Sequence, residues 1–329
     1  MLRRWVVIAP PDSERSRRGA TLLLERASSP AQATAVGHQA AGCGRVMNGT
    51  PSLVDLETVE AEAWVALQLS LPASIQQTLG IHVRRRDDAL VFIASGTREM
   101  AINKTMGLGL HVPLSEHTLD AVIADYTAAG ADRFIIQWHP DAQPAASPSW
   151  LAARGFVLLS RIAKHCRPIS QSELLPALPP ALQIDEIAVT EAQTFEAVVA
   201  RALGVPIGLE AGIRSTLGQP GWRYYLARDH GRPIAGGAYC VRGAHAWFGF
   251  GATLETDRRR GAQTSLLVRR MRDAAADGCV WASAETLLST AERPNQSYGN
   301  LRRLGFVCAY ERPNYLLELR PSASTSRPS

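Results

Sequence analysis

The chain has 329 residues, which predicts about two domains, and its 46% content of apolar residues excludes a chain that is disordered throughout. No run of 18 or more apolar residues occurs, so a membrane-spanning helix is excluded as well. Of the net charge of +5, residues 1–46 carry +4 (seven arginines against three acidic residues), so the body is nearly neutral and is not expected to bind nucleic acid.

Residues 1–52 are predicted to form a basic tail that is disordered or loosely ordered. Residues 10–52 are rich in Ala, Ser, Arg, Gly and Pro and show no sustained hydrophobic period. The apolar run over 5–9 is too short for a good signal peptide, so we predict a cytoplasmic protein. One hypothesis is that translation starts near Met47. Of the 35 Lys and Arg residues, all but Lys104 and Lys164 are arginine, which we attribute to a GC-rich, bacterial genome.

Residues 53–167 are predicted to form a first domain of helices and strands. Hydrophobic period and turn residues predict, in chain order, a helix over 55–69, a hairpin over 81–86 and 90–95, a strand over 102–112, a helix over 115–129, a strand over 133–138, a short helix over 148–154 and a strand over 156–163. A linker over 168–181 follows, because this stretch contains four prolines.

Residues 182–320 are predicted to form a second domain, and 321–329 a disordered tail. The second domain's expected elements are strands over 182–189, 222–228, 233–241, 244–254, 280–284 and 306–319, and helices over 191–203, 262–277 and 297–304. Both domains end with a strand, a short helix, a Gly-Phe pair and a last strand, and the two Gly-Phe pairs lie 150 residues apart, at Gly155 and Gly305. This spacing indicates two copies of one domain.

The most informative segment joins the strand over 244–254 to the helix over 262–277. The first N–H groups of a helix have no partner within the helix and lie at the positive end of its dipole. Gly261 would let a phosphate approach this backbone, and Arg258–Arg260 add positive charge, so the segment predicts a pyrophosphate site. The alternative is an ordinary connection with a solvated arginine run. Within the helix, Arg269, Arg270 and Arg272 are expected largely off the apolar face.

In this context the second domain resembles the GNAT acetyltransferase family. The family's pyrophosphate signature, Arg/Gln-x-x-Gly-x-Gly/Ala, corresponds to Arg258, Gly261 and Gln263. Its second signature, an Asn- or Ser-containing helix that ends in Leu-Gly-Phe, corresponds to Ser297, Asn300, Leu301, Leu304, Gly305 and Phe306. The resemblance covers about 140 residues. It implies an α/β fold with a mixed sheet (α+β), built from two tandem GNAT-like domains of which the first is a degenerate copy.

The resemblance implies acetyl-CoA as co-substrate, with no metal. It assigns the donor-binding residues Ala252, Thr253, Leu254, Arg258, Arg259, Arg260, Gly261, Ala262, Gln263, Thr264 and Asn300. Gln263 departs from the family pattern, but a backbone amide is still offered there. The first domain has no Gly-rich or Arg-rich turn, so it is not expected to bind acetyl-CoA. Its expected role is to pack against the second domain, to shape the acceptor pocket or to support a homodimer.

Two residues are candidates for proton transfer. Glu285 ends the fifth strand of the second domain, where the family's cleft opens, and is the candidate general base; the alternative is an exposed strand-end carboxylate or a cap. Many family members have a general-acid tyrosine where this chain has Leu301. Tyr298, one helical turn earlier, is the candidate substitute, and the alternative is an ordinary helix aromatic. Asn300 is expected to contact the CoA arm, the alternative being a capping amide.

These features predict an acetyl-CoA-dependent N-acetyltransferase that acts on the amine of a small molecule. The acceptor pocket is expected from 203–222 and pieces of the first domain. Two alternatives remain open: a tandem acyltransferase similar to mycothiol synthase, and a non-catalytic CoA-binding regulatory protein, which the leucine at position 301 favours. Neither nucleic acid nor a membrane is an expected partner.

Overall fold

The computed structural model describes residues 52–172, 182–206 and 208–319. Nearly all of the predicted N-terminal tail, most of the predicted linker and the C-terminal tail therefore lie outside the described residues. Ser52 begins the ordered chain as a helix cap: its hydroxyl accepts from the N–H of Asp55 at 3.0 Å, and the Asp55 carboxylate accepts from the N–H of Ser52 at 3.1 Å. No helix of the described residues is long and apolar enough to cross a membrane.

The first half contains four helices and five strands among the described residues. In chain order they are α1 (Leu53–Leu69), α2 (Ala73–Leu79), β1 (Ile81–Arg86), β2 (Ala89–Ala94), β3 (Lys104–Met106), α3 (Glu116–Ala128), β4 (Arg133–Gln137), α4 (Ser147–Ala153) and β5 (Val157–Pro168). The prediction of a strand over 102–112 is wrong at both ends. Only three residues pair as β3, because Gly107 and Gly109 take left-handed φ angles of 86° and 76° that end the extended chain.

The second half has a similar order, with one additional strand, β6, before its first helix. Its elements are β6 (Leu182–Glu186), η1 (Val189–Glu191), α5 (Ala192–Leu203), η2 (Glu210–Ile213), β7 (Trp222–Asp229), β8 (Arg232–Arg242), β9 (His245–Thr253), η3 (Glu255–Asp257), α6 (Ala262–Ala276), β10 (Trp281–Leu287), α7 (Gln296–Arg303) and β11 (Val307–Glu318). The strand pairing shows the repeat. In the first half β1, β2 and β3 pair antiparallel with one another, and β3 then pairs parallel with β4. In the second half β6 to β9 pair antiparallel, and β9 then pairs parallel with β10.

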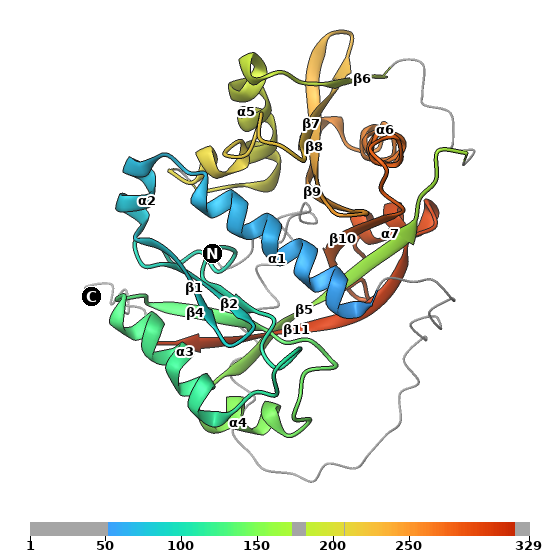
Figure 1. Cartoon of the computed structure of the whole chain (residues 1–329). Coiled ribbons are helices and arrows are strands. Elements are labelled where there is room, and N and C mark those ends of the chain that lie inside the picture. The colour runs from blue at the N-terminus through green and yellow to red at the C-terminus, as the bar shows by residue number, and fades with distance from the viewer. Residues whose placement is uncertain (1–51, 173–181, 207, 320–329) are drawn as a thin grey trace, which may run out of the picture.

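All eleven strands of the described residues form a single mixed sheet in the order β1-β2-β3-β4-β11-β5-β10-β9-β8-β7-β6 (Figure 1). The prediction of an α/β chain with a mixed sheet is confirmed. The last strand of each half lies in the other half: β11 pairs with β4, β5 pairs with β10, and β11 and β5 pair with each other. The two predicted domains are therefore joined through an exchange of their final strands.

Helices cover both faces of this sheet, and α1 runs across the sheet between the two halves (Figure 1). Successive side chains of β2 point to opposite faces of the sheet in the first half: Phe92 packs under α1 and Val91 packs under α3. Successive side chains of β9 do the same in the second half: Trp247 lies on the face covered by α1 and α5, and Phe248 lies under α6. One apolar core under α1 thus contains residues of both halves.

Candidate functional site

The N-terminus of α6 offers unpaired backbone amides. Gly261 caps the helix with a left-handed φ of 85°, and no side chain accepts from the first turn. The first amide bonded back to the cap is that of Ser265, at 2.9 Å from the carbonyl oxygen of Gly261. The amides of 262–264 therefore point outward from a helix of 15 residues, as an anion site requires.

The three arginines before this helix do not have equal roles. Arg260 bonds to Asp229 at 2.6 Å and to Asp257 at 3.3 Å, so acidic side chains neutralise its charge. Arg258 and Arg259 form no ion pair among the described residues, and Arg259 has a left-handed φ of 65°. The positive charge available to a phosphate at this turn thus comes from two arginines.

A bulge in β9 leads from this turn into the sheet. The register between β8 and β9 shifts so that Gly237 lies opposite both Phe250 and Gly251, and Phe250 has a left-handed φ of 56°. The parallel ladder between β9 and β10 ends at the pair Trp247–Ser283. Beyond that pair the edge of β9 that holds Ala252 and Thr253 is not paired with β10, whereas the N–H of Leu254 donates to Ile234 at 2.9 Å.

A narrow cavity lies between β9, β10, α6 and α7, and we name it the donor channel. It is lined by Phe248, Gly251, Gln263, Leu267, Arg270, Ala284, Ser297, Asn300 and Leu301. The structure therefore brings the predicted residues Gln263 and Asn300 together. Gln263 Nε2 donates to Thr253 Oγ1 at 3.0 Å, which ties the helix to the end of the strand. Asn300 Oδ1 accepts a hydrogen bond from Arg303.

Arg270 was expected off the apolar face of its helix, and this expectation is wrong. Its side chain is only 2% exposed and donates from Nη1 to the carbonyls of Ala238 (3.0 Å) and Gly249 (3.2 Å) beside the bulge. No carboxylate pairs with it among the described residues, and burial lowers its pKa to about 10. The Arg270 guanidinium fits in this position because Gly237 has no side chain. A Cβ at residue 237 would lie 2.9 Å from Arg270 Cζ.

The two predicted proton-transfer residues lie on opposite faces of β10. Tyr298 is on the α7 side, where its ring packs edge-on against His165 with centroids 4.8 Å apart. Leu301 is buried at 2% exposure and lines the donor channel. His165 belongs to β5, so the exchanged strand brings an imidazole of the first half to this face. Its Nε2 bonds to Thr286 Oγ1 at 3.0 Å, and burial lowers its pKa to about 3, which keeps the ring neutral.

Glu285 lies on the α1 side and is only 4% exposed, so the alternative of an exposed strand-end carboxylate is wrong. Its Oε1 accepts from Lys164 Nζ, and its Oε2 accepts from Trp247 Nε1 at 2.7 Å. Burial, together with the charge of Glu60, raises its pKa to about 7 against the opposing effect of Lys164. Such a pKa suits a general base near neutral pH, but both carboxylate oxygens already accept hydrogen bonds.

Glu285 belongs to a buried cluster of six charges that sequence reasoning missed. Arg312 of β11 donates to Glu57 and Glu60 of α1, each at 2.8 Å, and Lys164 donates to Glu60 at 3.0 Å. The sixth member is Lys104, whose ammonium lies 3.5 Å from the centre of the Trp64 ring and whose pKa burial lowers to about 7. Both lysines of the chain thus lie in this one cluster. Their rarity in the sequence was the one signal that could have pointed to it.

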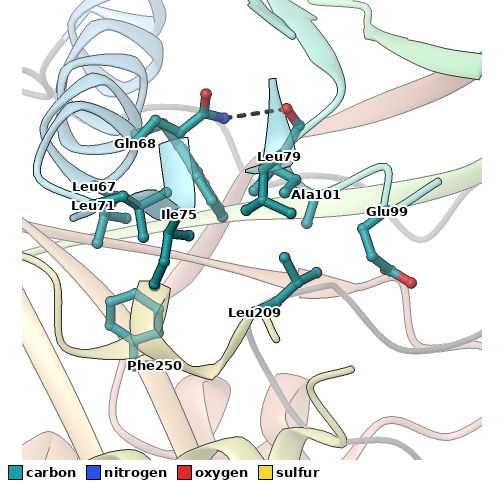
Figure 2. Close-up of a pocket in the computed structure, with 12 residues that line it drawn as sticks. Leu67, Gln68, Leu71, Ile75, Leu79, Glu99, Ala101, Leu209 and Phe250 are labelled. Carbon is teal, nitrogen blue, oxygen red and sulfur yellow. Dashed lines mark hydrogen bonds between the residues drawn. The ribbon is translucent and has the colours of Figure 1, made fainter. Parts of the chain in front are cut away.

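A second, larger cavity lies on the α1 side of β9 (Figure 2), and we name it the apolar pocket. The first half supplies Trp64, Leu67, Gln68, Leu71, Ile75, Leu79, Glu99, Ala101 and Ile102, and the second half supplies Leu209, Gly212 and Phe250. The segment expected to form the acceptor pocket, 203–222, thus contributes two of its residues. Among the described residues no group of three or more His, Cys, Asp or Glu side chains is arranged to hold a metal ion.

Comparison with known proteins identifies the fold. No family model and no curated protein sequence matches the chain. The structure is similar to a GCN5-related N-acetyltransferase from Kribbella flavida, with a TM-score of 0.55 and 16% identity over 80% of this chain and 98% of that one. A GCN5-related N-acetyltransferase from Sphaerobacter thermophilus gives a TM-score of 0.53 and 14% identity over 71% and 82%.

A tandem GNAT protein from the clavulanic acid biosynthesis pathway gives a TM-score of 0.52 and 12% identity over 82% of this chain and 94% of that one. These structures confirm the predicted resemblance at the level of the fold: the chain has the GNAT acetyltransferase fold in a tandem arrangement. At identities of 12–16%, these similarities show the fold alone.

Proposed function

We propose that the protein transfers an acetyl group from acetyl-CoA to the amine of a small molecule. The observation that carries this proposal is the alignment of three features: the α6 N-terminus without a side-chain cap, Arg258 and Arg259 without an ion pair among the described residues, and the donor channel that leads from this turn to the bulge of β9. An anion site that opens into a narrow channel suits a pyrophosphate with a long thin arm. Gln263 and Asn300 line this channel as the family resemblance implies.

The reaction needs few protein groups. The amine nitrogen forms a bond to the thioester carbon, the carbon–sulfur bond breaks, and the thiolate leaves with the proton that the amine releases. A backbone N–H at the bulge of β9 would polarise the thioester carbonyl. Tyr298 and Glu285 remain the candidates for moving protons, from the α7 and α1 sides of β10 respectively.

Two observations favour the alternative of a CoA-binding protein without turnover. Position 301 is an apolar, buried leucine, and both oxygens of Glu285 accept hydrogen bonds. The alternative of a tandem acyltransferase similar to mycothiol synthase shares the donor site and differs only in the acceptor.

The test has two stages. Titration calorimetry of the full chain with acetyl-CoA should show stoichiometric binding of one molecule per chain, since α6 is the only helix of the described residues that follows an arginine run and a glycine cap. Release of free thiol in the presence of an amine panel should then report transfer. Binding without thiol release from any amine would support the regulatory alternative, and absence of binding would reject both.

A further inference from the structure

We infer that the apolar pocket holds the acyl acceptor and that this acceptor is an amine with an apolar body, such as an arylalkylamine or an alkylamine. This inference rests on the proposed function and names the substrate class for it.

The position of the apolar pocket places an acceptor next to the donor. Phe250 lines the apolar pocket and Gly251, the next residue, lines the donor channel, so the two cavities lie on opposite sides of one bulge. The ladder between β9 and β10 has already ended at Trp247, which leaves this part of β9 unpaired on that edge. A nucleophile that sits against Phe250 is therefore one residue away from the wall of the donor channel.

The lining selects against polar acceptors. Ten of the twelve lining residues are apolar or glycine, and they come from α1, α2 and the turn between them, from the loop before β3, from η2 and the residue before it, and from β9. A sugar or a polyamine placed there would lose hydration and would find only two polar side chains in the lining, Gln68 and Glu99, whereas an apolar body gains about 25 cal/mol for each Å² that leaves water.

The few polar atoms lie at separate places in the pocket. Figure 2 shows Glu99 at the opposite end from Phe250, and its carboxylate is the only one in the lining. Gln68 Nε2 donates to the carbonyl of Ile102 at 3.2 Å, while its buried Oε1 has no hydrogen-bond partner among the described residues. The amide oxygen of Gln68 is therefore an unsatisfied acceptor among the described residues, and Glu99, the carboxylate of the lining, lies away from Phe250.

The same lining explains how an amine could attack without a free base. Burial away from a counter-charge lowers the pKa of an amine, so the pocket favours the neutral, nucleophilic form. The acceptor would then arrive deprotonated even though Lys164 and Trp247 occupy both oxygens of Glu285.

Gly212 of η2 lines the apolar pocket, and a larger side chain at this position can occupy the pocket. A Cβ at this position would meet only Leu71 Cδ2, at an ordinary van der Waals distance of 3.9 Å. We expect Gly212→Phe to lower kcat/KM for 2-phenylethylamine about tenfold or more, Gly212→Ala to give a smaller loss, and neither to change the affinity for acetyl-CoA. Ethylamine, with its short body, should be affected less than 2-phenylethylamine.

The panel for the wild-type chain contains 2-phenylethylamine and hexylamine as apolar acceptors, and spermidine and glucosamine as polar ones. The apolar amines should have kcat/KM values about tenfold higher or more. Turnover that favours the polar amines, or Gly212→Phe turnover equal to wild type, would overturn the inference and leave the proposed function standing. A chain that binds acetyl-CoA but acetylates no amine would overturn the proposed function, and the inference with it.

Discussion

The side chain of Glu285 illustrates how tertiary contacts change a residue's chemistry. In the sequence it is a carboxylate at the end of a strand; in the structure it is enclosed by Lys164 of the first half and by Trp247 of the neighbouring strand. Desolvation and the nearby Glu60 raise its pKa to about 7, and the ammonium of Lys164 only partly offsets this. Arg312, also in this cluster, acts in the same direction as Lys164.

The raised pKa of Glu285 predicts a specific pH dependence of stability. Between pH 7 and the ordinary value of 4.5, folded Glu285 takes up a proton that the unfolded chain does not bind. This residue's contribution is therefore fully present below about pH 4.5 and is lost as the pH rises through 7. The free energy of unfolding of the wild type, minus that of Glu285→Gln, should grow by on the order of 3 kcal/mol as the pH falls from 8 to 4.5.

Urea unfolding of both proteins at pH 5, 6, 7 and 8 measures this difference. Subtracting the two curves removes the contributions of titrating groups that are not coupled to Glu285, including His139 and His165, whose pKa values burial lowers. A difference that stays constant with pH would show that Glu285 is already ionised throughout the range. If Glu285 is also the general base, kcat/KM of the wild type should fall below about pH 7, and Glu285→Gln should lose this limb.

At the scale of the element, β9 and α6 together organise the donor side. The bulge at Phe250 and Gly251 lets one strand line two cavities, and Arg270 of α6 holds the carbonyls on the inner side of the bulge. The first turn of α6 then presents its amides beside Arg258 and Arg259, which have no acidic partner within the described part of the chain. Strand, turn and helix thus form a continuous path for a phosphate-bearing ligand.

The arginines of this turn should differ in their effect on donor affinity. We expect Arg258→Ala with Arg259→Ala to weaken acetyl-CoA binding about 10- to 100-fold, because a charge-assisted hydrogen bond contributes roughly 1.5–3 kcal/mol. Arg260→Ala is the matched comparison and should cost less, because Asp229 and Asp257 already engage its guanidinium.

Calorimetry at two salt concentrations measures both the affinities and their electrostatic part. The double variant should also show a weaker dependence on salt than the wild type. An equal loss from Arg260→Ala would contradict this assignment of the positive charge.

At the scale of the whole molecule, the exchange of β5 and β11 makes the two halves one body. Each half completes the other's part of the sheet, and α1 packs on both. The buried charges add to this connection: α1 supplies Glu57 and Glu60, and Lys164 and Arg312 come from the two exchanged strands. Separating these partners would leave buried charges without compensation, which is strongly unfavourable.

We therefore expect the two halves to stay associated after the chain is cleaved between them. A protease site introduced within 173–181, cleaved after folding, should give two fragments that elute together at the size of the intact chain and retain acetyl-CoA affinity. Uncut protein with the same inserted site is the control. Fragments that separate under native conditions would contradict a role of the exchanged strands in holding the halves together.

The sequence alone was sufficient for features that depend on neighbouring residues. Gly261 and the amphipathic pattern after it predict a helix that starts at 262, and α6 begins there, because the signals for a helix N-terminus lie within a few residues. The repeated Gly-Phe ends likewise predict the tandem arrangement, and the structural relatives confirm the fold.

Only the tertiary structure decided the features that depend on distant residues. Arg270 is buried because Gly237, 33 positions earlier, leaves room for it. Glu285 is enclosed because β5 of the other half pairs with β10, and the apolar pocket forms because α1 crosses the sheet to reach η2 and β9. No local pattern encodes such contacts, since hydrophobic period reports which face of an element is buried but not which element covers it.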